Sequence, residues 1–220
     1  TTHPLIIAAI VASAMFMEVL ESTVLLTALP RMAETFGRSP VDLSIGVTAY
    51  LLSFAALIPA SGWVADHYGT RTVFSAAIAL FVVASVWCGL SNSLEMFTAA
   101  RVLQGAGASM MSPVGRMTMM RVIERRQVAR AINWVAMAGL IGPTIGPPLG
   151  GFITTYWDWR WIFFINVPIG LVGMLLVWRH FPNLRASEQR PFDAAGFLLN
   201  AGSLTGVLYG LHQLTESEAD

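Results

Sequence analysis

Three charged side chains lie inside apolar stretches of this sequence, where charge is expensive. Glu18 and Glu21 fall within the apolar run Leu5–Leu29, and Arg101 falls within Met96–Met119. Charged groups at such a depth in a bilayer are rare, are usually paired, and commonly mark proton or substrate pathways. Residues three apart share one face of a helix, so both acids point the same way. An acid that binds and releases a proton in such a place can couple proton movement to another process.

Glu21 and Arg101 are predicted to lie at similar depths. Counted from the ends of their runs on the same side, Glu21 is about 12 Å deep and Arg101 about 8 Å deep, at about 1.5 Å per residue. Arg does not release its proton and therefore needs a carboxylate or water beside it. Glu18 would lie about one turn deeper, near the midplane. Glu21, Glu18 and Arg101 could together form a proton-coupling group, or the pair could be purely structural.

The composition predicts an all-α polytopic membrane protein. The 220 residues are 55% hydrophobic and 12% charged, with a mean hydropathy of +0.63, whereas a soluble domain is about a quarter charged. Several apolar runs approach or exceed the length that a membrane-spanning helix needs. They are too long and unbroken for the alternating strands of a barrel. The net charge of zero suggests no nucleic-acid partner.

The residues that are absent exclude several classes of chemistry. All 13 basic residues are Arg, so the chain has neither a Walker A phosphate loop nor a Schiff-base lysine. The single Cys88 excludes an internal disulfide and a multi-Cys zinc site. Neither HExxH nor GxSxG occurs. We therefore expect no enzyme activity, no cofactor and no metal.

Seven spans are predicted, joined by short connections. They are Leu5–Leu29, Ser44–Ala65, Thr72–Leu90, Met96–Met119, Ala131–Tyr156, Trp161–Trp178 and Ala194–Leu214. Basic residues concentrate in cytoplasmic loops. Nine Arg lie in or beside the even connections and three in the odd ones: Arg71, Arg116, Arg121, Arg125, Arg126, Arg130, Arg179, Arg185 and Arg190, against Arg31, Arg38 and Arg160. This bias predicts a multi-pass protein of the cell inner membrane with a cytoplasmic N-terminus.

A short sequence pattern that occurs twice favours an internal repeat of three helices. Pro59-x-x-Gly62 is followed by Arg71, and Pro148-x-x-Gly151 is followed at the same spacing by Arg160. The two occurrences are three spans apart, and an odd number of spans reverses the orientation in the membrane. The pattern therefore predicts a three-plus-three inverted repeat, as transporters use. Two short matches could also arise by chance.

Two further segments carry glycine and charge in unusual patterns. The connection after the second span contains Gly62, Asp66, Gly69 and Arg71, which could form a tight, charged cytoplasmic latch or an ordinary glycine turn. The fifth span is rich in residues that kink helices or allow close helix contact, which suggests a hinge or seal. These are Gly142, Pro143, Gly146, Pro147, Gly150 and Gly151.

These motifs together resemble a known family. The latch is similar to the cytoplasmic signature of the major facilitator superfamily, and Arg101-x-x-Gln104-Gly105-x-Gly107 resembles its fourth-helix motif. The Gly142–Gly151 run resembles the fifth-helix antiporter motif of its drug-exporting members. Leu20–Pro30 and Trp159–Pro168 are similar to segments of the 14-helix drug:proton antiporter branch.

The sequence departs from the family pattern at several positions. Glu21 stands where the first-helix motif usually has Asp, and Glu18 is an additional acid. His67 and Thr70 stand where the latch often has basic residues. The resemblance also implies a protein about twice as long, so the second helical bundle would be missing here.

The resemblance implies the N-terminal half of a proton-coupled antiporter that exports drug-like amphipathic compounds. Residues 1–180 would form a six-helix transmembrane bundle, 181–192 a cytoplasmic connection, and 193–220 the seventh helix with an outer tail. The implied partners are membrane lipid, protons, a small amphipathic substrate and the missing C-terminal half.

Three alternatives remain open at this stage. The protein could import or export a specific metabolite within the same superfamily. It could be a half-transporter that pairs with a second chain or with itself. It could also be a membrane protein that transports nothing, although the chain shows no soluble signalling domain.

Overall fold

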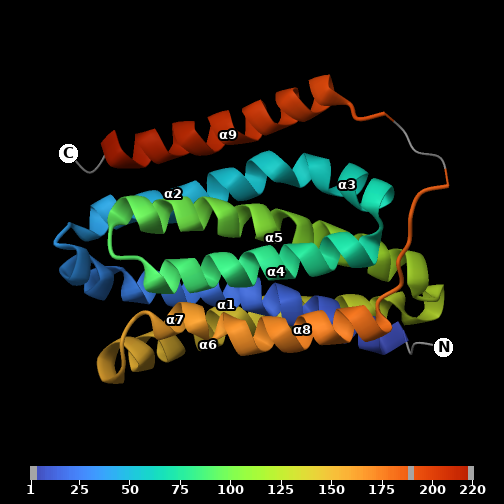
Figure 1. Cartoon of the computed structure of the whole chain (residues 1–220), viewed down its shortest axis with the longest axis horizontal. Helices are drawn as coiled ribbons and strands as arrows, with labels where there is room; N and C mark the ends of the chain where they lie inside the picture. The colour runs from blue at the N-terminus through green and yellow to red at the C-terminus, as the bar shows by residue number, and fades with distance from the viewer. Residues whose placement is uncertain (1–3, 188–190, 218–220) are drawn as a thin grey trace.

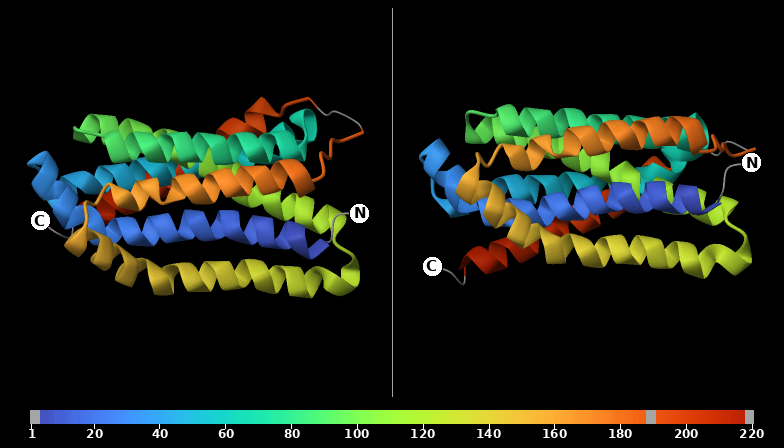
Figure 2. Two further views of the ribbon diagram at one scale, coloured as in Figure 1. Left: turned by 60° about the horizontal axis from the view of Figure 1, so that its bottom comes forward. Right: turned by 90° about the horizontal axis from the view of Figure 1, so that it is seen from below.

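The protein is a bundle of helices that lie side by side, seen here in a computed structural model. The structure describes residues 4–187 and 191–217, and within that part no β-strand occurs. Figures 1 and 2 show the long helices running roughly parallel and antiparallel along one common direction. Arg190 of the predicted connection and the last acidic residues, 218–220, lie outside this description. The predicted all-α architecture is confirmed.

The helices follow the predicted spans. Their bounds are α1 Pro4–Phe36, α2 Pro40–Leu57, the 3₁₀ turn η1 Ile58–Ala60, α3 Ser61–Tyr68, α4 Thr70–Leu90, α5 Leu94–Val122, α6 Arg125–Tyr156, α7 Trp161–Phe164, α8 Asn166–His180 and α9 Ala194–Ser217. Five helical segments of the described chain are long and apolar enough to cross a membrane. They correspond to α1, α2 to α3, α4, α6, and α7 to α8.

The predicted fourth and seventh spans are not among these five segments. Helix α5 is long, but it carries Glu95, Arg101, Arg116 and Arg121 within one helix. It packs against α1, α2 and α4, so protein surrounds much of its polar surface. Among the described side chains of α9, Ala194–Val207 form an apolar helical segment.

The first helix is longer than the sequence pattern predicted. The predicted span ended at Leu29, yet α1 continues past Pro30 to Phe36. A proline removes one backbone hydrogen bond, but Pro30 lies on an exposed turn. The last turns of α1 are held because Met32 and Ala33 are buried and Trp159 Nε1 donates to Thr35 Oγ1 at 3.1 Å.

Local capping explains where several helices begin. Ser39 and Asp42 form a reciprocal capping box that starts α2 before the predicted Ser44. Ser93 accepts a hydrogen bond from the Met96 backbone and starts α5 in the same way. Gly37, with φ of 63°, ends α1, and Arg38 N donates back to Ala33 O.

The core consists of two apolar clusters with a polar layer between them. One cluster includes Met17, Phe74 and Phe81, and the other includes Leu25 and Phe97. In a membrane such packing is stabilised mainly by van der Waals contact, because lipid is as apolar as the side chains. Along α1, Met17 belongs to the first cluster and Leu20 to the second. Glu21 directly follows Leu20, so the fold buries this acid close to the point where α1 passes from one cluster to the other.

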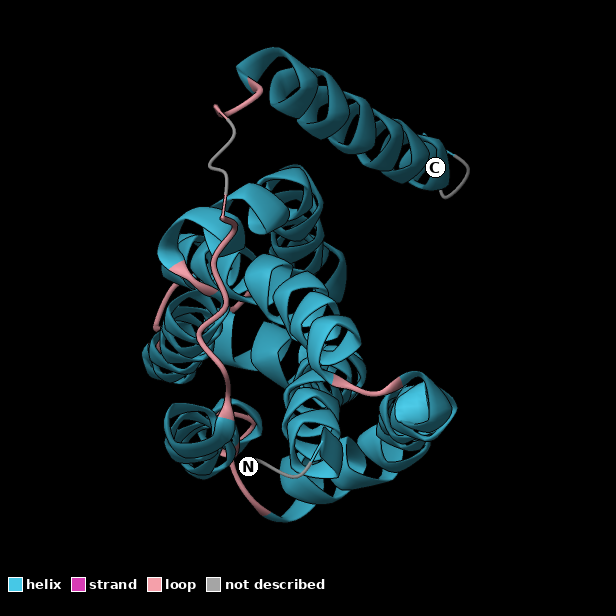
Figure 3. Cartoon of the chain, turned by 90° about the vertical axis from the view of Figure 1, so that its right-hand side faces the viewer, coloured by secondary structure: helices cyan, strands magenta, loops and turns pink. Residues whose placement is uncertain are grey.

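Helix α9 lies apart from the six-helix bundle and covers α2. Figure 3 shows the linker after α8 crossing one end of the bundle before α9 begins. Contacts between α9 and the bundle are to α2 and η1. The predicted division into a bundle, a connection and a seventh helix stays a prediction.

Candidate functional site

A buried carboxylate on α1 is the centre of the candidate site. Glu21 is 3% exposed, and Arg101 of α5 is 1% exposed. Arg101 Nη1 lies 2.7 Å from Glu21 Oε1, so the pairing predicted from depth is present. Two amides donate to the other carboxylate oxygen: Gln104 Nε2 at 2.7 Å and Asn166 Nδ2 at 2.9 Å. Three helices, α1, α5 and α8, therefore meet at one carboxylate.

The guanidinium of Arg101 has further partners of its own. Nη1 also donates to Gln104 Oε1, and Nε donates to the carbonyl oxygen of Gly46 at 3.3 Å. The Tyr50 ring lies beneath the guanidinium, with the centroid 4.3 Å from Cζ. The permanent charge of Arg101 is thus balanced by one carboxylate. It is further stabilised by hydrogen bonds to a backbone carbonyl of α2 and to the Gln104 side chain of α5.

Ser85 of α4 completes the buried polar network. Its hydroxyl accepts from Gln104 Nε2 at 2.7 Å and from Asn166 Nδ2 at 3.4 Å. All members of this network are at least nine-tenths buried. An ion pair of this kind contributes little net stability, but removing one partner alone is strongly destabilising. We call Glu21, Arg101, Gln104, Asn166 and Ser85 the acid network.

Glu18 has a different environment from Glu21. It is half-buried, and Ser112 Oγ of α5 donates to its Oε2 at 2.7 Å. Within the described residues no cation forms an ion pair with Glu18, whereas Arg101 pairs with Glu21. The two predicted acids share a helix face, but only Glu21 belongs to the acid network.

The glycines of α6 form a seam against α1. Gly142 faces Val19, Gly146 faces Thr23, and a Cβ added at either glycine would press into those side chains. Gly150 continues the seam at the same spacing against α1. Gly, spaced four residues apart, lets two helices approach closely in a membrane. Gly151, by contrast, has no neighbour within 4 Å of such a Cβ.

The prolines of α6 do not interrupt the helix. Pro143 and Pro147 lie within the continuous helix Arg125–Tyr156 and are exposed, on the side away from the glycine seam. Thr23 Oγ1 reaches across to the carbonyl oxygen of Gly142 at 3.5 Å. The hinge or seal function predicted for this segment stays a prediction.

The predicted latch surrounds the turn between α3 and α4. Gly69 has φ of 95°, which favours glycine, while Gly62 has open space around it. Asp66 forms its ion pair with Arg121 of α5, at 3.0 Å. Arg71 instead donates from Nε to the carbonyl oxygen of Phe181 at 2.8 Å. The latch therefore joins α3, α4 and α5 with the linker that follows α8.

The linker is fastened to the latch by several hydrogen bonds. Thr70 is fully buried and donates to the carbonyl oxygen of Pro182 at 2.9 Å, while its hydroxyl accepts from Leu184 N at 3.1 Å. Asn183 Oδ1 accepts from Arg71 N, and Ala186 N donates to Asp66 O. These bonds hold the linker along one end of the bundle, where Figure 3 shows it.

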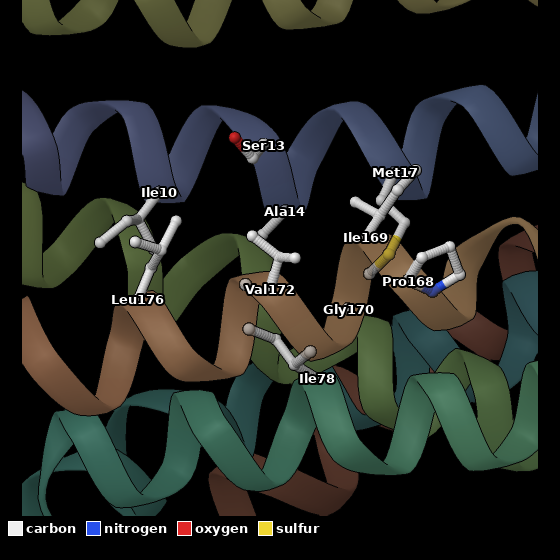
Figure 4. A pocket seen from close by; sticks show the side chains of 11 residues that line it. Ile10, Ser13, Ala14, Met17, Ile78, Pro168, Ile169, Gly170, Val172 and Leu176 are labelled. Atoms are coloured by element: carbon white, nitrogen blue, oxygen red, sulfur yellow. The ribbon is translucent and has the colours of Figure 1, made fainter.

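A separate apolar pocket lies between α1 and α8. Its volume is about 360 Å³, and Figure 4 shows Ile10 and Leu176 at one end, with Met17 and Pro168 at the other. Ile78 of α4 also lines it, and none of its lining residues is charged. The predicted site residues are not among them, so this pocket is distinct from the acid network.

Comparison with known proteins identifies the family. The family model described as Major Facilitator Superfamily matches residues 11–212 of the chain. The chain belongs to this superfamily. The fold is that of the N-terminal half of a major facilitator, and two solved structures resemble it.

The solved structures are similar in fold alone, because the sequences are only 15% identical. The human organic anion transporter MFSD10 (TETRAN) has a TM-score of 0.72 and aligns over 93% of this chain and 55% of its own. A D-xylose-proton symporter has a TM-score of 0.67 and aligns over 94% of this chain and 53% of its own.

Curated relatives are closer in sequence and longer. The putative multidrug resistance protein MdtD of Salmonella typhi is 47% identical over 192 residues, which cover 87% of this chain and 41% of that protein. MdtD of Salmonella newport matches to the same extent. This chain therefore spans about two fifths of the length of these relatives.

Four residues of the site were not among the predicted site residues, although Gln104 and Asn166 lie in segments that carried the family resemblance. Gln104 follows Arg101 by three positions, so helix periodicity could have placed both on one face. Arg121 was counted only as part of a basic cluster. Asn166 and Ser85 lie in apolar surroundings far along the chain, and no local pattern relates them to Glu21.

The two kinds of latch contact are expected to differ in strength. Thr70→Val removes a fully buried hydroxyl with two linker bonds and should lower the free energy of unfolding by about 1–3 kcal/mol. Arg121→Gln removes an ion pair whose side chains are 40% and 36% exposed, and should cost less than about 1 kcal/mol. Denaturant unfolding of the full-length protein in detergent would measure both. A larger loss in Arg121→Gln than in Thr70→Val would contradict this assignment.

Proposed function

We propose that this chain is the N-terminal part of a proton-coupled antiporter that exports drug-like amphipathic compounds. Membership of the superfamily and the 47% identity to putative multidrug resistance proteins support drug export. The acid network supports proton coupling. The protein would lie in the inner membrane with its N-terminus in the cytoplasm, as the arginine distribution indicates.

The observation that carries the proposal is the buried Glu21–Arg101 pair. Since Arg101 keeps its charge, only the protonation of Glu21 changes the net charge of this pair. Ionised Glu21 holds α1 to α5 through a charge-assisted hydrogen bond at 2.7 Å. Protonation removes the attraction between the two helices and frees Arg101. Proton binding at Glu21 would in this way change how tightly α1 and α5 pack together.

Glu18 would act beside Glu21 as a second proton-binding or substrate-facing acid. Its single hydrogen bond from Ser112 and its partial exposure leave the carboxylate open to a second partner. A protonated amine on an amphipathic compound would match it in charge. Glu18 would therefore act near the substrate path, and Glu21 would bind the proton inside the bundle.

The remaining segments would serve alternating access between two bundles. The latch around Asp66 and Arg71 would close the cytoplasmic side, and the α6 segment Gly142–Gly151 would bend and seal against leak. The missing C-terminal part would supply the other wall of the substrate path. The length of the MdtD relatives is consistent with such a part.

A transport assay on the full-length protein tests the proposal. The purified protein would be reconstituted in vesicles with a fluorescent lipophilic cation, and a pH gradient would be imposed across the membrane. We expect cation movement against its own gradient, coupled to proton movement in the opposite direction and abolished by a proton ionophore. A rate of cation transport that the ionophore does not change would exclude proton coupling. Proton-linked movement of sugars or other metabolites, with none of the cation, would favour a specific metabolite transporter of the same superfamily.

The same preparation would test the half-transporter alternative. If a product of this length alone gives proton-linked transport, its mass in detergent shows whether it pairs with itself or with a second chain. Activity that requires the longer chain supports the proposal.

A further inference from the structure

The acid network contains one amide whose orientation is not fixed by its neighbours. Asn166 is 1% exposed and is the first residue of α8, directly after the turn at Ile165 that separates α7 from α8. The short break re-aims the chain, and the Asn166 side chain points at the carboxylate of Glu21. Its Nδ2 lies 2.9 Å from Glu21 Oε2 and 3.4 Å from Ser85 Oγ.

The network as it stands suits only an ionised Glu21. Its carboxylate accepts hydrogen bonds from Arg101, Gln104 and Asn166, and all three partners are N–H donors. A protonated carboxyl has an O–H that needs an acceptor. With only donors around it, that O–H would be a buried donor without a partner, which is costly. One neighbour must therefore change when Glu21 takes a proton.

Gln104 cannot make that change. Its Oε1 accepts from Arg101 Nη1 and from Cys88 Sγ, while its Nε2 donates to Glu21 and Ser85. If this amide turned over, its NH₂ group would face the guanidinium, which has donors only. The permanent charge of Arg101 therefore locks Gln104 in one orientation.

Asn166 is not locked in this way. Among the described residues no donor reaches its Oδ1, and its Nδ2 contacts only Glu21 and Ser85. A hydroxyl both donates and accepts, so Ser85 suits either orientation of the amide. Half a turn about the Cβ–Cγ bond of Asn166 would place Oδ1 where Nδ2 now lies.

We propose that Asn166 is the positioning residue that lets Glu21 alternate between its two protonation states. The proton comes from water and forms an O–H bond at Glu21 Oε2, and the carboxyl charge goes from −1 to 0. The Asn166 amide turns over, and its Oδ1 accepts the new O–H. When the proton leaves, the amide turns back and Nδ2 donates again. No electron moves, and Arg101 keeps its charge throughout.

This inference rests on the proposed proton-coupled function. The charged or titratable groups around the Glu21 carboxyl are Arg101 of α5, Glu18 of α1, Tyr50 of α2 and Cys88 of α4. Asn166 and Ser85 carry no charge. The network members from α8 and α4 are therefore neutral polar groups.

The test compares two variants of nearly equal shape in the full-length protein. Asn166→Thr keeps a group that donates and accepts, whereas Asn166→Val keeps neither. In vesicles, we expect proton-coupled transport by Asn166→Val to fall by about tenfold or more, as loss of one buried hydrogen bond permits, and Asn166→Thr to stay within about threefold of the wild type. Asn200→Ala on α9 is the control, because within the described residues Asn200 Nδ2 donates only to the carbonyl oxygen of Gly196 in its own helix.

A second readout follows the side chains directly. Infrared difference spectra recorded between high and low pH should show the protonated carboxyl of Glu21, assigned by its loss in Glu21→Gln. We expect a difference band of the Asn166 side-chain carbonyl to appear with it, and to vanish in both Glu21→Gln and Asn166→Val. A residue that only supports the fold would show no such coupled band.

The outcomes separate this inference from the proposed function. If Glu21 titrates without any Asn166 carbonyl band, or if the Val and Thr variants transport equally, the inference is wrong while proton coupling stands. If the wild type shows no proton-linked transport, the proposed function fails. The infrared experiment then still decides whether the amide turns when Glu21 is protonated.

Discussion

Glu21→Gln should abolish proton-coupled export by the full-length protein. Gln has nearly the shape of Glu but cannot bind and release a proton. Replacing the acid that exchanges protons should lower coupled transport by about 100-fold or more. Export driven by a pH gradient, measured in vesicles over a series of pH values, would show this loss as an activity that no longer depends on pH.

The same substitution has a structural consequence that must be separated from the functional one. It leaves Arg101, at 1% exposure, as a buried charge without its ion-pair partner. Breaking a buried pair on one side costs about 3–5 kcal/mol. The double variant Glu21→Gln with Arg101→Gln removes that unpaired charge. It should recover most of the lost stability in detergent while transport stays uncoupled.

Three single variants serve as comparisons for Glu21→Gln. Glu34→Gln makes the same chemical change on the same helix, at an exposed ion pair with Arg31, and should transport normally. Glu21→Asp keeps an acid of shorter reach and should keep part of the coupling. Glu18→Gln should weaken transport without removing its pH dependence. Undiminished pH-driven export by Glu21→Gln would remove this residue from the mechanism.

Gly146→Leu should stop transport by forcing α6 away from α1. A Cβ at this position would already overlap the Thr23 side chain, and Leu adds three more carbon atoms. Overfilling a closely packed contact typically costs about 1–3 kcal/mol, and here the contact is the seam along which two long helices meet. We expect loss of export together with a lower unfolding temperature in detergent.

The matched control for Gly146→Leu lies on the same helix. No atom of the described residues lies within 4 Å of a Cβ added at Gly139, so Gly139→Leu should fold and transport nearly as well as the wild type. Gly146→Ala, which adds one carbon atom, should fall between the two. Normal export by Gly146→Leu would contradict the view that close contact along this seam is needed.

The acid network and the glycine seam both involve helix α1. Gly142 meets Val19 and the Leu20 backbone, immediately before Glu21. A change in the attraction between Glu21 and Arg101 therefore acts on the segment of α1 that α6 touches. Both predictions concern α1, and the proposed cycle requires that this helix respond to the proton and transmit its movement to α6.

The sequence by itself determined the class of fold and indicated that Glu21 could pair with Arg101. Long apolar runs leave the backbone no partner except its own helix, so the all-α architecture follows from composition. Counting along two such runs placed Glu21 and Arg101 at similar depths, since helix rise is constant. The sequence also marked Gly142, Gly146 and Gly150 as residues that allow close helix contact, and α6 presents them to α1.

The tertiary structure alone decided which groups complete the site. Ser85 and Asn166 are far from Glu21 in the chain, and they meet it only because α4 and α8 pack beside α1. It also decided that Asp66 pairs with Arg121 rather than with a residue of its own turn. The physical reason is that helix geometry fixes depth and face, whereas the identity of the neighbour depends on how separate helices pack together.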